Sequence, residues 1–199
     1  MQERDFEALW EKYSSLLQRL EDENINNFLE AEGQRLLECS YSQRTNEPFC
    51  GIAGVIEYSL LLASTAKSML SALKWNVPMT SVIKCALLSE AGRTGTLTRN
   101  RFKNTKSEWH IEKLGQYYDW DETCPKYSVQ HMTLFKLQHF GIKLSWEEWQ
   151  AISLMTSMSS EENKFYGYTA SKLATLMMMS RHAILQNENE KNSEVVLPF

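Results

Sequence analysis

Residues 86–95 read Ala-Leu-Leu-Ser-Glu-Ala-Gly-Arg-Thr-Gly, an apolar run that turns polar at a Ser-Glu pair. Upstream of this run, Thr80 or Ser81 offers a side-chain oxygen that can cap the start of a helix. Gly92 is the residue type that commonly ends a helix. The stretch therefore predicts a helix from Thr80 or Ser81 to Gly92, with the Ser-Glu pair in its last turn.

Apolar residues on both sides of this stretch repeat at three- and four-residue steps, which is the pattern of amphipathic helices. The further helices that this pattern predicts cover residues 4–21, 23–38, 53–73, 128–140, 145–156 and 169–186. Ser145 followed by Glu148 is a capping-box signature and supports the start of the helix at 145. The polar residues 187–192 predict a frayed end.

The region 93–127 is the least regular part of the chain. Thr96 to Thr98 on one side, and Trp109, Ile111 and Tyr117 to Tyr118 on the other, predict a short β-hairpin. The predicted fold class is therefore all-α, a helical bundle with a small β-hairpin insert. A length of 199 residues with 43% apolar residues fits one domain with an ample core.

Composition bounds the function. The net charge of −4 argues against non-specific binding of nucleic acid, which requires a basic surface. The four cysteines include no CxxC pair, so a zinc site is not expected. No apolar stretch is long enough to cross a membrane, and the first residues do not resemble a signal peptide. Unpaired thiols and no export signal predict a cytoplasmic protein.

The stretch Ala86 to Gly95 resembles the "ALLHDxxK" signature of the HD-domain metal-dependent phosphohydrolases. Residues 54–60 are similar to the family's "GGLVEHSL" segment, and residues 98–118 to its "RNxK…W…YYxxDD" insert. Residues 137–152 and 173–176 resemble its later helices. The resemblance spans about residues 28–186 and implies one HD-like domain over 1–199, with 1–21 as an N-terminal helical extension and 187–199 as a tail.

The resemblance also implies where metal ligands would stand, and this chain departs from the pattern there. The residues at these degenerate positions are Tyr58, Ser89, Glu90, Val129, Met155 and Arg181 (or Ser180). Only Glu90 keeps a carboxylate, and the family's lysine after the HD pair is Arg93. One carboxylate does not hold a catalytic metal, and a nearby arginine would repel it. We therefore expect no catalytic residues, no metal and no cofactor.

The first functional hypothesis is a catalytically inactive HD-like module that binds and regulates another protein. Because members of this family are frequent in phages, the resemblance favours a phage-encoded inhibitor or modulator of a host protein. Trp146 and Trp10 are the candidate partner-interface residues, whereas Trp149 is expected to pack inward. The helix 4–21 is expected to pack on its own domain, with a homodimer as an alternative.

Two alternatives stay open. In the first, the pocket is a metal-free nucleotide or phosphate sensor, because guanidinium groups offer rigid forks to anions. Its candidate residues are Arg93, Arg99, Arg101 and Arg181. In the second, the protein is an HD phosphohydrolase whose metal site is rearranged onto His131, His182 and Glu90.

Overall fold

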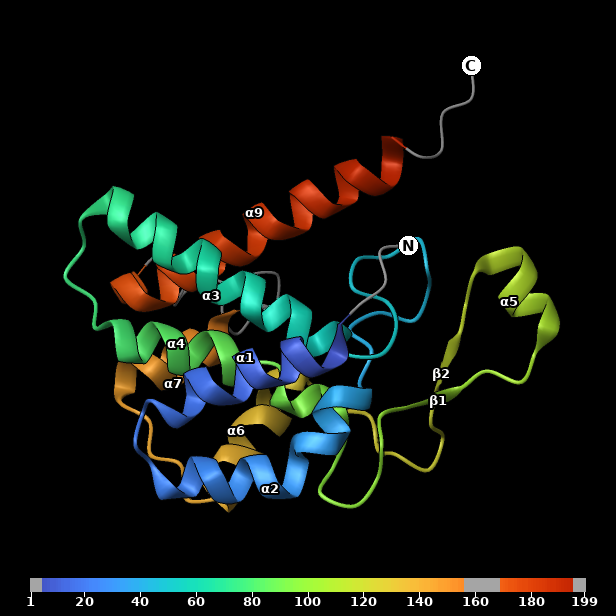
Figure 1. The fold of residues 1–199 in the computed structure, drawn as a ribbon, viewed down its shortest axis with the longest axis horizontal. Coiled ribbons are helices and arrows are strands. Elements are labelled where there is room, and N and C mark those ends of the chain that lie inside the picture. Colours follow the sequence, from blue (N-terminus) through green and yellow to red (C-terminus); the bar gives the residue numbers. More distant parts are fainter. Residues whose placement is uncertain (1–4, 156–168, 195–199) are drawn as a thin grey trace.

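The protein is described by a computed structural model that covers residues 5–155 and 169–194. These parts are predominantly helical, with one small antiparallel two-stranded sheet, which confirms the predicted fold class (Figure 1). The elements in chain order are α1 (Phe6–Gln18), α2 (Glu23–Glu38), α3 (Gly54–Leu73), α4 (Met79–Leu88), η1 (Ala91–Thr94), β1 (Phe102–Asn104), α5 (Glu108–Leu114), β2 (Tyr118–Trp120), α6 (Val129–His139), α7 (Trp146–Leu154) and α9 (Lys172–Glu194).

Side-chain caps fix where several helices begin. Asp5 accepts a hydrogen bond from the backbone N–H of Ala8, and Asp22 accepts one from that of Asn24. Ser145 and Glu148 form the predicted capping box at the start of α7. These contacts satisfy backbone donors that an uncapped helix would leave without partners.

The core lies where α3 packs against α4 and α9, and where α7 packs against α4, α6 and α9 (Figure 1). Helix α1 also belongs to this core, because it contacts α2, α3 and α4 and buries Tyr13 and Leu17 completely. The Tyr13 hydroxyl donates to the carbonyl of Leu87 at 2.7 Å, which ties α1 to the last turn of α4. The helix predicted over 4–21 therefore packs on its own domain, as expected.

Strands β1 and β2 and the short helix α5 form an arm that projects from the bundle (Figure 1). The strands pair in register from Phe102 opposite Trp120 to Asn104 opposite Tyr118. No residue of α5 is buried. The backbone N–H of Thr45 donates to the carbonyl of Gly115 at 2.9 Å, so the loop before α3 holds the arm in place.

Three local predictions were wrong. Helix α4 begins at Met79 after Pro78, without the side-chain cap expected from Thr80 or Ser81. It ends at Leu88 rather than Gly92, because the chain tightens into the 3₁₀ turn η1. The hairpin exists, but Thr96–Thr98 lies in a loop, and Trp109 and Ile111 lie in α5, which Ser107 caps. Helix α9 continues through the polar residues 187–192, where neither glycine nor proline interrupts it.

None of the helices in the described parts is both long enough and apolar enough to cross a bilayer.

Candidate functional site

Ser89 and Glu90 directly follow the last residue of α4, and both are buried. Ser89 is buried, and its hydroxyl donates to the carbonyl of Ala86 at 3.4 Å. Glu90 has no exposed surface, and its Oε2 accepts a hydrogen bond from Arg93 Nε at 2.7 Å. Because η1 is a 3₁₀ turn, residues three apart lie on the same side, which brings these two charges together.

The Arg93 guanidinium is fixed by more than Glu90. Its Nη1 donates to the backbone carbonyl of Tyr41 at 2.8 Å, and its carbon lies 3.9 Å from the centre of the Tyr41 ring. Burial, the largest single effect, would lower the pKa of Arg93, but Glu90, Tyr41 and Cys39 together outweigh burial and the pKa is raised. The site therefore holds a permanent cation beside its only carboxylate.

Tyr58 is completely buried and stacks on Tyr41 with 4.4 Å between ring centres. Burial raises the pKa of Tyr58 well above its ordinary value. Tyr41 and Glu90 raise this pKa further, whereas Arg181 and Arg93 oppose the rise. The structure thus brings Tyr58, Glu90, Arg93 and Arg181 into one neighbourhood.

These residues do not fit a divalent metal. The described part of the chain contains no group of three His, Cys, Asp or Glu side chains placed to hold one. Glu90 is neutralised by Arg93, and the phenol of Tyr58 stays protonated. Cationic guanidiniums around the single carboxylate oppose the approach of a metal ion.

Val129 and Met155, the other positions where the resemblance would place metal ligands, carry apolar side chains that offer no oxygen or nitrogen ligand to a metal ion. Val129 begins α6 and Met155 directly follows α7. Both side chains are buried, and Met155 belongs to the apolar core. The alternative ligands His131 and His182 are exposed, whereas Glu90 is wholly buried. The structure does not assemble these three residues into a metal site in the residues it describes.

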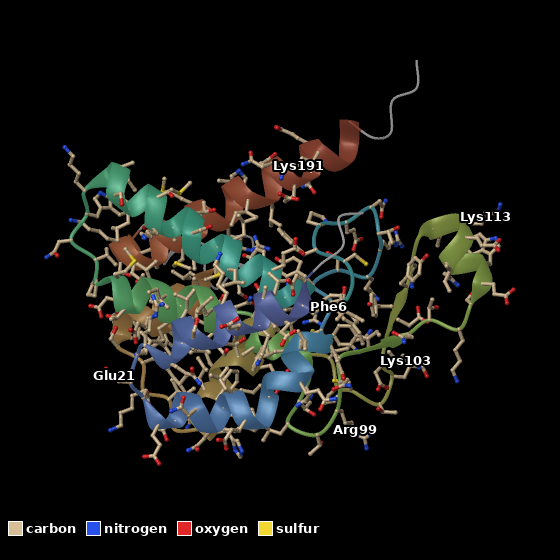
Figure 2. All side chains as sticks on the ribbon, viewed as in Figure 1. Phe6, Glu21, Arg99, Lys103, Lys113 and Lys191 are labelled. Carbon is tan, nitrogen blue, oxygen red and sulfur yellow. The ribbon has the colours of Figure 1, made fainter. Side chains whose placement is uncertain are left out.

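Arg93 and Arg101 line one cavity of about 560 Å³, which also reaches Lys103 and Tyr118 of the arm. Arg99 does not line it, and Figure 2 shows Arg99 in the loop before β1 and Lys103 on β1 itself. Of the four arginines predicted to bind phosphate, two therefore share a cavity. Arg181 lies instead beside Tyr58 and Tyr41.

Sequence reasoning missed a second buried charge cluster beside this cavity. Lys136, with no exposed surface, donates to Glu32 Oε2 at 2.6 Å and to Thr94 Oγ1 at 2.5 Å. Arg35 also pairs with Glu32, at 2.8 Å. The lysine at a position between the core-facing Thr133 and Leu137 was the only sequence feature that could have indicated this cluster.

The candidate interface tryptophans have different surroundings. Trp146 is 66% exposed, as expected, but Trp149 is 43% exposed, so the prediction that it packs inward was wrong. The two rings stack with 5.2 Å between their centres and 12° between their planes. Trp10 is half-buried, stacks on Tyr13 and lies against Gly33 of α2, so it serves the packing of α1.

Comparisons of the chain with protein-family models, with curated proteins and with solved structures give no match.

Proposed function

We propose that this protein is a catalytically inactive, HD-like binding module that acts on a protein partner. The observation that carries the proposal is the buried ion pair between Glu90 and Arg93. A carboxylate that neutralises a buried guanidinium is a poor ligand for a metal, because releasing it would leave the cation unpaired. The resemblance to HD domains is part of the proposal.

Hydrolysis by an HD-type site depends on metal ions that acidify a bound water and clamp a phosphate. Around Glu90, the chain instead places two arginines and two tyrosines. Phenols are neutral near pH 7 even at their ordinary pKa, and burial raises the pKa values of Tyr41 and Tyr58 further. This neighbourhood supports a structural role for the residues that replaced the ligands.

The surface that supports a protein partner is the stacked pair Trp146 and Trp149 on α7. The opposite side of α7 buries Ala151, Ile152 and Leu154 in the core, so the aromatic pair stands on a fixed helix. Exposed tryptophans on a rigid element are typical of the centres of protein interfaces. We propose that this protein is a phage-encoded factor and that its partner is a host protein, which it modulates in the cytoplasm.

The interface is tested by capturing partners from a bacterial lysate with the wild-type protein and with Trp146→Ser/Trp149→Ser. Trp109→Ser is the matched control, because Trp109 is 58% exposed but lies on the arm. We expect one protein that the wild type and the control retain and the double variant loses. Equal capture by all three would contradict the proposed interface.

Self-association is separated from a foreign partner by analytical ultracentrifugation. A mass that rises with concentration, and returns to the monomer value in Trp146→Ser/Trp149→Ser, would assign the pair to a homodimer instead.

The absence of catalysis is tested by turnover of nucleotides and phosphoesters with Mn²⁺, Co²⁺ or Ni²⁺ added. We expect no turnover above a protein-free control. Activity that disappears in Glu90→Ala would show that Glu90 takes part in metal chemistry and would overturn the proposal.

A further inference from the structure

The cavity that Arg93 and Arg101 share is lined by more basic than acidic side chains, although the net charge of the protein is −4. Its basic lining residues are Arg35, Arg93, Arg101 and Lys103. Phe102 and Tyr118 add aromatic surface on the side of the arm. With about 560 Å³, the cavity has the size of a small-molecule site.

Arg101 is a cation of this cavity that no carboxylate neutralises in the described residues. It forms no ion pair with a carboxylate in the described residues, and its Nε and Nη1 are buried without a hydrogen-bond partner. Aromatic rings hold it instead: its guanidinium carbon lies 4.7 Å from the centre of the Trp120 ring, 5.4 Å from Phe102 and 5.8 Å from Tyr127.

Arg93 and Arg101 also repel each other. Burial lowers the pKa of Arg101, and the positive charge of Arg93 lowers it further. Glu90 pairs with Arg93 and also raises the pKa of Arg101, but by less than burial and Arg93 lower it. An anion between the two guanidiniums would relieve this repulsion and supply the counter-charge that Arg101 lacks.

Hydrogen bonds from Arg35 fix the loop of residues 94–100, which precedes Arg101, by contacts within the protein itself. Arg35 donates to the backbone carbonyls of Thr94 and Arg99, both at 3.0 Å, and to Asn100 Oδ1 at 3.1 Å. A site whose charged groups are fixed in advance loses little freedom on binding.

The two acidic residues at the cavity do not cancel its charge. Glu38 is exposed and accepts a hydrogen bond from the side chain of Gln34 at 3.0 Å. Asp121 accepts the backbone N–H of Thr123 at 2.9 Å and its hydroxyl at 2.8 Å. Neither forms an ion pair with Arg93 or Arg101 in the part of the chain described.

We propose that this cavity binds a phosphate-bearing small molecule, with the phosphate between Arg93 and Arg101 and the remainder against Phe102 and Tyr118. A dianionic phosphate matches two guanidiniums better than a monocarboxylate does, because it offers more oxygens and more charge. The cavity is larger than orthophosphate requires, which favours a ligand with an attached apolar group. This inference is independent of the protein partner proposed above.

Calorimetric titration with orthophosphate and with phenyl phosphate, at constant ionic strength, tests the proposal. We expect both to bind and phenyl phosphate to bind more tightly. Arg101→Gln should weaken both by about tenfold or more, the usual effect of losing a hydrogen bond to a charged group. Arg99→Gln is the matched control, because Arg99 is exposed two residues away and does not line the cavity.

The Trp120 indole N–H, which donates to the carbonyl of Cys124 at 3.3 Å, gives a local second readout by NMR. Its resonance should shift with phenyl phosphate in the wild type and in Arg99→Gln. If Arg101→Gln does not fold, Arg101→Lys keeps the charge without the fork and should still bind more weakly than the wild type. No binding at millimolar phenyl phosphate, or equal weakening by Arg99→Gln and Arg101→Gln, would overturn the proposal.

Discussion

Glu90 and Arg93 form an ion pair in which the carboxylate is completely buried and its Oε2 lies 2.7 Å from Arg93 Nε. The same guanidinium lies on the Tyr41 ring, which in turn stacks on Tyr58. One arginine thus connects the positions where the HD-domain resemblance would place a metal and its ligands.

Breaking the pair from either side should be costly. Arg93→Gln leaves a buried carboxylate without its counter-ion, and Glu90→Gln leaves a buried guanidinium, so each should lower the free energy of unfolding by about 3–5 kcal/mol. The double variant should lose less than the sum of the two, because neither charge is then left unpaired. Urea denaturation measures all three. A loss below about 1 kcal/mol in each single variant would match a solvated pair instead.

The buried cluster around Lys136 predicts that Glu32→Gln and Lys136→Met lower the stability of the protein by different amounts. Glu32→Gln removes the only carboxylate that the described structure gives to Lys136, which has no exposed surface. Lys136→Met leaves Glu32 with Arg35, at 2.8 Å. Glu32→Gln should therefore destabilise the protein more, by up to about 3–5 kcal/mol. Thermal unfolding of the two variants side by side checks the order, and the reverse order would contradict this interpretation of the cluster.

Gly92 should not tolerate a side chain. An added Cβ would lie 2.2 Å from the carbonyl oxygen of Val129 and 2.6 Å from the backbone N of Thr133. Because both contacts are with the backbone of α6, Gly92→Ala should cost about 1–3 kcal/mol or more. Gly33→Ala is the comparison, since its Cβ would meet the end of the Trp10 side chain, which can shift. Equal losses would show that η1 is not held against α6.

Stability should fall at alkaline pH. Burial raises the pKa values of Tyr13, Tyr41 and Tyr58, so the folded state keeps protons that the unfolded state releases near pH 10. Their contribution is present in full below about pH 10 and is lost as the pH rises above it. Tyrosinate absorbance during an alkaline titration should show these three ionising only together with unfolding. Smooth titration near pH 10 of all eight tyrosines in a folded protein would contradict this.

Much of the fold follows from local sequence patterns. The helix over 23–38 and the capping box at Ser145 were predicted correctly, because apolar spacing and cap residues determine them locally. The end of α4 was misplaced, because Gly92 is required by the close approach of α6 and not by a helix stop. Trp149 was assigned inward from its spacing alone, whereas the stack with Trp146 keeps it at the surface.

The expected site residues came from the resemblance to HD domains, which stays a proposal. The structure places Tyr58 near Glu90 and Arg181, and no local sequence pattern indicates this proximity. The pairing of Lys136 with Glu32 joins residues far apart in the chain, and no local pattern indicates such a contact. The aromatic surroundings of Arg101 likewise depend on how the arm folds back on residues 120–127.

The most direct test of the central claim is the metal content of the protein, purified without a metal-binding tag and measured by plasma mass spectrometry. If Glu90 serves Arg93, the wild-type protein should carry far less than one transition metal per chain. A content near one or two metals per chain, lost in Glu90→Gln while the protein stays folded, would identify Glu90 as a ligand and contradict the account.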